Sequence, residues 1–442
     1  MFSTQNSKPT AKTFILSILL ILNFSLFGQE VKSNVSPYAL HIIQNLASDA
    51  FLGRGYVDEG MNRTADFIAD EFEKFGLEKV NGSYFQEFEM PINILENARL
   101  ILNGKELKYG IDFIVKPSSY SQSFHKKDIY TFPAYDFENS ITSETRFIDF
   151  IQRDMIQQKG KHVVFPPHTF QVDSLNNYYK NWSSFYRPEE NQNRALLFFT
   201  KDKLTSSLST HQDSLALFYV SEDFYSKNLR IDDYKIESNF QSTYKTKNVI
   251  GKIKGKSDSL IVLTAHFDHL GKVGETIFHG ASDNASGTAF LLELAKYFSK
   301  NPPEYTLVFI AFAAEEAGMV GSNYFVENPE IDLAKIKFLL NFDIMGAGNE
   351  GIQIVNSTIF TNEYDLLNQI NFQKKYTSQI RKRGEACNSD HCPFYQKGVP
   401  SFFIYTLGGP GHYHDPLDIA ESLNLAGFEG LKRLFIEFIQ KL

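Results

Sequence analysis

The second half of the chain, from about residue 246 onward, alternates continuous apolar runs with segments of helical periodicity. The apolar runs are SLIVLTAH, TLVFIAFAA, IKFLLNF, GIQIV and SFFIYT, and the helical segments are SGTAFLLELAKYFSK and LAGFEGLKRLFIEFIQ. Strands that are apolar throughout are buried on both sides, as is typical of parallel sheets covered by helices. The sequence therefore predicts an α/β fold: a three-layer sandwich with a mixed, mostly parallel central sheet covered by helices on both faces.

The N-terminus has the pattern of a signal peptide. Lys8 and Lys12 precede an uncharged apolar stretch from Thr13 to Gly28, which has the length of a signal-peptide core and is short for a membrane span. We predict a signal peptide over residues 1–28; an uncleaved membrane anchor is the alternative. No later segment is apolar enough over a sufficient length to span a bilayer. The mature chain is therefore expected to be exported, to the periplasm or out of the cell, where disulfides can form.

Two segments with different residue patterns follow the predicted signal peptide. In NRTADFIADEFEKFGL, apolar side chains three and four residues apart predict an amphipathic helix that ends at Gly76. From about residue 97 to 244, short β-rich runs such as LILNG, KHVVFPP, ALLFFTKD and LALFYVSED are separated by polar clusters. We therefore predict one main domain made of residues 29–96 and 245–442, interrupted by an inserted β-rich module over residues 97–244.

Composition and charge limit the classes of partner. Of the 442 residues, 43% are hydrophobic and 22% are charged, so the chain can bury a large core. The formal net charge is -8 at pH 7, which gives no basic field to hold nucleic acid or an anionic membrane. We expect neither kind of partner.

Cysteine usage indicates one short-range bond. The chain has two cysteines, Cys387 and Cys392, both within ACNSDHCPF. Two thiols cannot by themselves complete a tetrahedral zinc site, and an exported compartment favours pairing them. We predict a disulfide across this loop, with two unpaired buried cysteines as the alternative.

Imidazoles and carboxylates follow the points where the predicted strands end. In open α/β sheets, binding sites form beyond the carboxyl ends of the strands, so these side chains are expected to converge although they are far apart in the sequence. The candidate metal ligands are His266, Asp283, Glu316, Asp343 and His414. Imidazole with carboxylate oxygen and no thiolate suits catalytic zinc. Five ligands suit two metals that share a carboxylate, about 3.5 to 4 Å apart.

The adjacent pair Glu315 and Glu316 has a natural place in such a site. Successive side chains of a strand point in different directions, so Glu316 can bind metal while Glu315 faces a water as general base. Asp268, two residues after His266, suits a carboxylate that fixes the imidazole's orientation. Each signal alone is weak, because a Glu-Glu pair is usually solvated surface and Asp343 could cap a helix. Their occurrence at successive strand ends is what predicts a site.

The ordered motifs AHFDHLG, GASDNASG, AAEEAGMVGS, LNFDIMG, SDHCPF and YHDPLD resemble those of the twenty-eighth metallopeptidase family. This family includes secreted bacterial leucyl-type aminopeptidases and has glutamate carboxypeptidase and glutaminyl cyclases as relatives. The resemblance covers about residues 246 to 420, and NLASDAFLGRG is similar to the family's N-terminal segment. Many relatives carry a protease-associated β domain where the module 97–244 is inserted.

The resemblance implies two zinc ions as cofactors. One would be held by His266 and Asp343 and the other by Glu316 and His414, with Asp283 bridging them. Glu315 would be the base and Asp268 the supporting aspartate. A cis peptide bond is implied between Asp283 and Asn284.

Other residues near these motifs carry open alternatives. Tyr413 matches the family's tyrosine before the last histidine, and could hydrogen-bond a developing oxyanion; His412 competes with His414 for the ligand position. His391 has either a supporting, substrate-contacting role or a structural one. His269 and His279 are taken as structural. Four aromatic side chains could line a pocket for the substrate's first side chain or belong to the core: Phe394, Tyr395, Phe402 and Tyr405.

The resemblance and the predicted site together favour a zinc-dependent exopeptidase, a metallo-aminopeptidase that hydrolyses N-terminal residues from peptide substrates. A glutaminyl-peptide cyclotransferase on the same scaffold is the first alternative. A noncatalytic binding protein that keeps the fold is the second.

Overall fold

The computed structural model of this protein describes residues 35–134, 160–170 and 194–442, together with six isolated positions between residues 145 and 179. The predicted signal peptide lies outside the described residues. None of the helices within the described residues combines the length and the apolarity needed to cross a bilayer.

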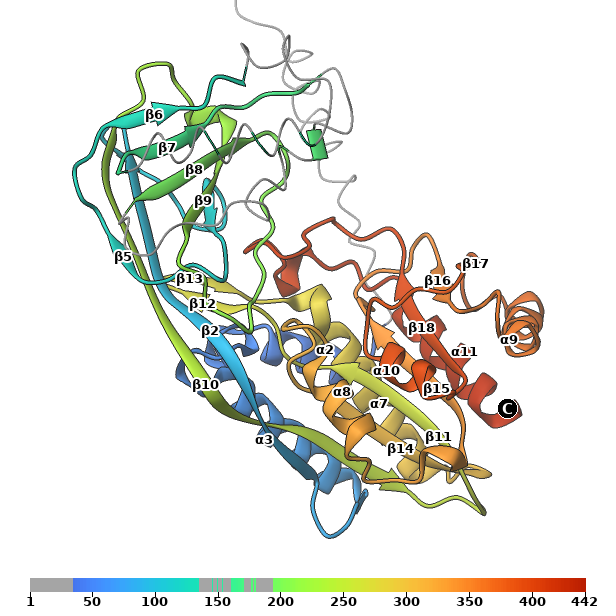
Figure 1. Cartoon of the computed structure of the whole chain (residues 1–442). Helices are drawn as coiled ribbons and strands as arrows, with labels where there is room; N and C mark the ends of the chain where they lie inside the picture. The colour runs from blue at the N-terminus through green and yellow to red at the C-terminus, as the bar shows by residue number, and fades with distance from the viewer. Residues whose placement is uncertain are drawn as a thin grey trace, which may run out of the picture. The chain divides into compact units, whose positions relative to one another are not determined.

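A large mixed sheet forms the centre of the fold (Figure 1). Its neighbouring strands run in the order β17-β16-β18-β15-β11-β14-β10-β2-β3, and β1 and β5 pair with β10. The strands are β1 (Glu78–Lys79), β2 (Phe85–Leu102), β3 (Lys105–Glu106), β5 (Gln122–Ser123), β10 (Ile231–Ile253), β11 (Ser257–His266), β14 (Tyr305–Phe312), β15 (Ile336–Asp343), β16 (Ile352–Val355), β17 (Ile380–Lys382) and β18 (Ser401–Thr406). The apolar runs of the second half therefore form adjacent strands, as predicted.

The four middle strands β14, β11, β15 and β18 are parallel to one another. The long strands β10 and β2 are antiparallel to their neighbours, and so is the β16–β18 pair. The predicted mixed sheet is thus confirmed, with parallel strands in its middle and antiparallel pairs towards its edges. Most of the antiparallel pairing comes from β2 and β10, a long pair whose direction the residue pattern does not indicate.

Helices cover both faces of the sheet, which confirms the three-layer arrangement. On β14, Leu307, Phe309 and Ala311 belong to the core on one face, and Val308 and Ile310 to the core on the other. The first core includes α2 (Pro37–Leu46), α3 (Gly60–Phe75), α7 (Gly287–Lys300), α9 (Thr361–Lys374) and α11 (Phe428–Lys441); the second includes α8 (Val320–Glu327) and α10 (His391–Gln396). A strand can be apolar throughout because both sides of it are buried.

The residues at one end of α3 and of α7 show how far local sequence specifies where a helix begins or ends. The predicted helix before Gly76 is α3, and Gly76 ends it with a φ of 74°, a left-handed conformation that favours glycine. Ser286, a residue type that often caps helices, precedes α7 but does not cap it, because its own φ and ψ are already helical. Its hydroxyl donates instead to the carbonyl of Ser282 at 2.7 Å.

Between β2 and β10 in the chain lies a second sheet with the strand order β4-β9-β8-β7-β6. Its strands are β4 (Phe113–Val115), β6 (Ile129–Thr131), β7 (His162–Phe165), β8 (Ala195–Thr200) and β9 (Ala216–Ser221). Three of the predicted β-rich runs are therefore strands of one sheet. The boundaries of the module at residues 97 and 244, and its likeness to a protease-associated domain, stay predictions. A two-stranded hairpin, β12 (Gly271–Val273) and β13 (Thr276–Phe278), completes the strands.

Cys387 and Cys392 form the predicted disulfide.

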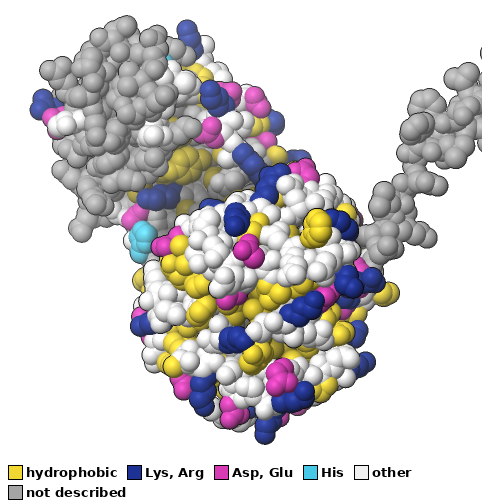
Figure 2. Space-filling model, turned by 90° about the vertical axis from the view of Figure 1, so that its right-hand side faces the viewer, with side chains coloured by type: hydrophobic (Ala, Val, Ile, Leu, Met, Phe, Trp, Pro, Cys, Tyr) yellow, Lys and Arg dark blue, Asp and Glu magenta, His cyan; other side chains and the backbone are white. Residues whose placement is uncertain are grey.

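On the molecular face in Figure 2, lysine and arginine side chains are interspersed with aspartate and glutamate, and hydrophobic side chains lie between them. This face therefore offers no continuous field of one sign.

Candidate metal centre

Side chains from distant parts of the chain converge at the carboxyl ends of the middle strands. One group able to hold a metal ion is His266, Asp283 and Asp343, and another is His269, Asp283 and Glu316; the ligand atoms of each group lie within 4.8 Å of one another. Asp283 belongs to both. The side chains are buried and come from the ends of β11 and β15 and from the turns that follow β11, β13 and β14.

His266, the last residue of β11, presents one ring nitrogen to two carboxylates. Its Nε2 atom lies 3.3 Å from an oxygen of Asp283 and 3.3 Å from an oxygen of Asp343. Its Nδ1 atom lies 3.3 Å from the main-chain oxygen of Asp268. A carbonyl only accepts, so Nδ1 carries a hydrogen, and Nε2 is the ring nitrogen that a metal in the cluster would use.

Asp283 sits in a turn that the surrounding chain holds tightly. The peptide bond between Asp283 and Asn284 is cis, as predicted. The carboxylate of Asp418 accepts from the main-chain nitrogens of Ser282 and Asp283 at 2.9 and 3.0 Å. The turn is thereby anchored to a segment more than a hundred residues later, and both oxygens of Asp283 remain available to the cluster.

Arg54 anchors the turn that carries Asp283 and is a functional candidate that the sequence analysis missed. Its guanidinium is fully buried and donates to the main-chain oxygens of Leu46, Phe267, His279, Gly280 and Asp283, at distances from 2.6 to 3.3 Å. Burial lowers the pKa of Arg54 to about 10, so the side chain is charged at neutral pH. The only sequence signal was its place in FLGRG, within the segment similar to the family's N-terminus.

Asp268 fixes the adjacent glutamates. One of its carboxylate oxygens accepts from the main-chain nitrogen of Glu315 at 3.0 Å, and the other from that of Glu316 at 3.3 Å. One Asp268 oxygen also lies 3.7 Å from Nδ1 of His266. Asp268 therefore orients the glutamate pair more directly than it orients the imidazole, although its predicted role concerned the imidazole alone.

The two glutamates differ in their surroundings. Glu316 contacts two imidazoles: its carboxylate lies 2.6 Å from Nδ1 of His269 and 2.9 Å from Nε2 of His414. Burial alone would raise the pKa of Glu316, but these imidazoles outweigh burial and lower it to about 2. Burial raises the pKa of Glu315 well above its usual value; His266 opposes that shift, and neighbouring carboxylates add to it.

His414 reaches the cluster from the loop after β18. Its Nε2 atom lies 3.3 Å from an oxygen of Asp283 and 2.9 Å from an oxygen of Glu316. Its Nδ1 atom donates to the main-chain oxygen of Ser206 at 2.9 Å, so Nε2 is the ring nitrogen that a metal in the cluster would use. The competing His412 lies outside the cluster, partly exposed and 3.6 Å from Asp415.

The partner of His414 belongs to the region between β2 and β10. The main-chain nitrogen of Ser206 donates to the oxygen of His414 at 3.0 Å, which completes a reciprocal pair. The Lys203 ammonium lies 2.5 Å from the Asp415 carboxylate and donates to the main-chain oxygens of Gly411 and Tyr413. A segment within the predicted insert therefore holds the loop that carries His414.

His269 and Asp390 are further members of this site that the sequence analysis did not single out. His269 was expected to be structural, yet it belongs to the second ligand group with Asp283 and Glu316. Asp390 is fully buried, and its carboxylate oxygens have no hydrogen-bond partner that meets ordinary geometry among the described residues. Burial raises the pKa of Asp390 to about 7. Both lie within motifs quoted above, AHFDHLG and SDHCPF, but residue type and spacing did not assign either of them to the cluster.

A pocket of about 290 Å³ opens onto the cluster. Its walls include Glu315, Arg383, Phe403, Tyr405 and Tyr413. The Tyr413 ring stacks on His414 with the ring centroids 3.8 Å apart. Of the four aromatic side chains proposed for a substrate pocket, Tyr405 lines this one.

The remaining aromatic candidates and His391 have other surroundings. Phe394 and Phe402 belong to the cores on the two faces of the sheet, and the Tyr395 hydroxyl donates to Glu385. His391 is buried, stacks on Phe403 and bonds through Nε2 to the main-chain oxygen of Ala386. His391 thus supports a pocket wall from behind, and a substrate contact for it stays a prediction.

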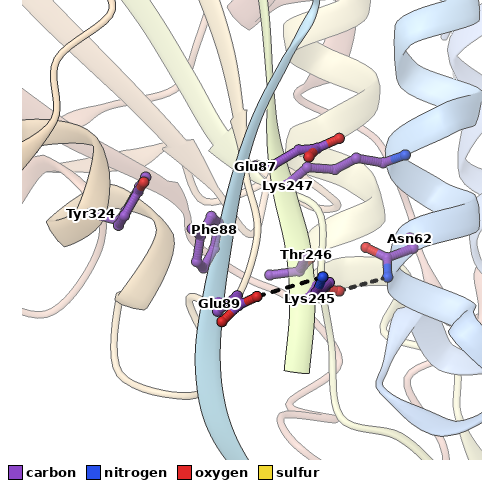
Figure 3. A pocket seen from close by; sticks show the side chains of 8 residues that line it. All are labelled: Asn62, Glu87, Phe88, Glu89, Lys245, Thr246, Lys247 and Tyr324. Atoms are coloured by element: carbon purple, nitrogen blue, oxygen red, sulfur yellow. Dashed lines mark hydrogen bonds and ion pairs between the residues drawn. The ribbon is translucent and has the colours of Figure 1, made fainter. Parts of the chain in front are cut away.

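A larger pocket, of about 470 Å³, lies elsewhere, between β2, β10, α3 and α8 (Figure 3). Its lysines have acidic partners: Lys245 lies 3.6 Å from Glu89, and Lys247 lies 2.5 Å from Asp66. This pocket offers no cluster of imidazoles and carboxylates.

The central cluster fits divalent cations. The three carboxylates of Asp283, Glu316 and Asp343 are buried together, and burying like charges is costly unless cations or strong hydrogen bonds compensate. His266 and His414 both direct an Nε2 atom towards these carboxylates. Imidazole nitrogen with carboxylate oxygen, without thiolate, is a donor set of catalytic zinc.

The sheet and this cluster define an α/β protein with a candidate metal centre at the strand ends. Residues 248–439 match the model of Peptidase family M28. Over these residues the chain is therefore similar to peptidase family M28, as the sequence motifs indicated.

Individual relatives agree with this assignment. The chain is 30% identical over 197 residues to aminopeptidase YwaD of Bacillus subtilis (strain 168), covering 40% of this chain and 41% of the relative. It is 30% identical over 215 residues to a probable leucine aminopeptidase of Arthroderma otae, covering 45% of this chain and 57% of that relative. These matches thus span about half of the relatives' lengths.

A solved structure shows a similar fold over most of the chain. The zinc aminopeptidase from Bacillus subtilis aligns with a TM-score of 0.64 and 19% identity, covering 91% of this chain and 94% of that one. At that identity the likeness establishes the fold alone.

Proposed function

We propose that this protein is a zinc-dependent exopeptidase that hydrolyses N-terminal residues from peptides. The observation that carries the proposal is the position of Glu315, which lines a pocket together with His266, Asp283, Glu316 and Asp343. A side chain able to exchange a proton thus borders the same space as the candidate metal ligands. The aminopeptidase relatives support the reaction class.

The residues present suit two zinc ions. His266 and Asp343 would hold one, Glu316 and His414 the other, and Asp283 both; His269 is a further candidate beside Glu316. When bound, the metals would polarise the scissile carbonyl and make a water more acidic.

Glu315 is proposed to act as the general base. It takes a proton from the attacking water as the new C–O bond forms, and passes a proton to the leaving amine as the C–N bond breaks. Its raised pKa favours proton uptake, and bound cations would lower that pKa towards the operating pH. Tyr413, which also lines the pocket, is proposed to donate a hydrogen bond to the carbonyl oxygen as negative charge develops there.

Export of the mature chain after removal of residues 1–28 is part of the proposal and rests on the N-terminal sequence pattern. The glutaminyl cyclase alternative has less support, because the curated relatives described above are aminopeptidases. The noncatalytic alternative requires a degraded site, whereas every predicted ligand is present.

The test is hydrolysis of leucyl-p-nitroanilide by the mature chain, with and without a chelator, beside cyclisation of a glutaminyl peptide. We expect zinc-dependent hydrolysis and no cyclisation. Glu315→Gln should lower kcat by about 10² to 10⁴, the usual contribution of a general base, while zinc content measured by atomic emission stays unchanged. Full activity of that variant would refute the role of Glu315, and cyclisation without hydrolysis would replace the proposed function.

A further inference from the structure

The pocket beside the metal centre contains a positive side chain that the proposed reaction does not use. Arg383 lines the pocket together with Glu315 and Asp343. The other ionisable side chains of its wall are the candidate ligands, the proposed base, and two tyrosines. Arg383 is therefore the cationic group that a bound substrate would meet.

The surrounding chain holds Arg383 in place. It directly follows β17, and its main-chain nitrogen donates to the oxygen of Ile354 and to the hydroxyl of Ser357, both at 3.0 Å. Its Nη1 atom donates to the Tyr405 hydroxyl at 2.9 Å. Tyr405 in turn is the cross-strand neighbour of Asp343 in the β15–β18 pair. The guanidinium is thus tied to the strand next to a candidate metal ligand.

No carboxylate in the described part of the chain lies within ion-pair distance of the Arg383 guanidinium. Some arginines differ in this respect: Arg99 lies 2.6 Å from Asp233, and Arg230 pairs with Asp232. The lysines of the larger pocket in Figure 3 also have acidic partners. A guanidinium has five N–H donors, of which the Tyr405 hydroxyl accepts one.

We propose that Arg383 is a specificity-determining residue that binds a carboxylate of the peptide substrate, an inference that rests on the proposed exopeptidase function. A guanidinium matches a carboxylate with two parallel hydrogen bonds, and a partly enclosed site strengthens that pair. Two carboxylates of a peptide have the required chemistry: the side chain of an N-terminal aspartate or glutamate, and the C-terminal carboxylate of a dipeptide.

The experiment compares four substrates with and without a carboxylate on the mature, zinc-loaded enzyme. Glutamyl- and leucyl-p-nitroanilide differ in the side-chain carboxylate, and Leu-Leu and Leu-Leu-amide differ in the C-terminal one. Arg383→Gln is expected to lower kcat/KM about 10- to 100-fold for the carboxylate substrate of one pair, chiefly through KM, since charged hydrogen bonds contribute that much. The neutral substrates should change less than about threefold. The pair that responds identifies the source of the carboxylate.

Arg381→Gln is the matched control, because Arg381 is an exposed arginine two residues earlier in β17 and is absent from the pocket wall. It should leave all four substrates unchanged. Arg383→Lys, which keeps the charge without the planar donor pair, should restore part of the lost kcat/KM.

An equal loss on charged and neutral substrates, or no loss on any, would overturn the role of Arg383 while the exopeptidase function stands. Wild-type enzyme that hydrolyses none of the four substrates would instead overturn the proposed function, and this inference with it.

Discussion

The candidate metal centre is built from two regions that are held in different ways. His266 and Asp343 are the final residues of strands β11 and β15, which lie side by side in the middle of the sheet. His414 comes from a loop and takes its place through Ser206 and Lys203, which lie in the region between β2 and β10. Asp283 contacts both histidines and joins the two regions.

Ligands at strand ends and ligands on loops are therefore held in position by different parts of the chain. A strand-end ligand is positioned by a ladder of main-chain hydrogen bonds and by core packing on both sides of the sheet. A loop ligand needs specific partners, because few buried contacts restrain a loop. The region between the two long strands therefore has a role at the metal centre even though it contributes none of the predicted ligands.

The largest expected effect comes from removing the charge of Asp283, the residue that joins the two regions. Asp283→Asn removes the charge shared by both histidines, so we expect loss of bound zinc and at least about a thousandfold lower kcat, since several kcal/mol of stabilisation depend on the metals. Atomic emission and kinetics on the same preparation measure both. Asp258→Asn, an exposed change at the second residue of β11, is the control. Retention of both zinc ions at full activity would contradict the joining role.

The next effect separates folding from metal binding in the strand-end region. Arg54→Met leaves several buried carbonyls without a donor and removes a buried positive charge near Asp283 and Asp418, so the free energy of unfolding should fall by roughly 3 to 5 kcal/mol. Denaturant unfolding of the metal-free chain gives the value. Arg63→Met, at an exposed position on α3, should change it by less than about 0.5 kcal/mol. If both variants unfold alike, Arg54 does not anchor the turn.

The smallest effect tests the loop region alone. Lys203→Met removes a half-exposed ion pair with buried Asp415, so unfolding should change by less than about 1 kcal/mol. The loop carrying His414 loses a support, and partners of this kind typically change metal affinity about tenfold or more. Competition with a zinc chelator should show weakened binding of one zinc ion. Lys201→Met, two residues away and bonded to Thr169, is the control. Unchanged zinc affinity in Lys203→Met would mean that Ser206 alone holds the loop.

The strand-end region could be predicted because its signals are local. An apolar run that stops at His266 or Asp343 marks a strand and its end at once, and the order of parallel strands brings such ends together. The helix ending at Gly76, the disulfide and the cis bond before Asn284 were likewise predicted and are confirmed. The assignment of individual ligands to two zinc ions stays a prediction.

The contacts that complete the site left no local signal. His269 lies in the second ligand group, Arg54 donates to five carbonyls, and Asp390 is buried beside the cluster. Each has a role only through partners far away in the sequence. A lone histidine, arginine or aspartate has the same local pattern whether it is solvated or buried, so periodicity and spacing could not select them.

The amino-acid sequence by itself determined the layers of the fold, the strand ends and the residue types that meet there. Hydrophobic periodicity and the polar breaks between apolar runs are properties of short segments, so they can be seen in the sequence. The tertiary structure alone decided which of His412 and His414 reaches the cluster, that Lys203 and Ser206 hold the loop, and that Arg383 faces the pocket without an acidic partner in the described chain. These outcomes depend on the direction in which each side chain points and on what lies within a few ångströms of it. Packing of distant segments sets both.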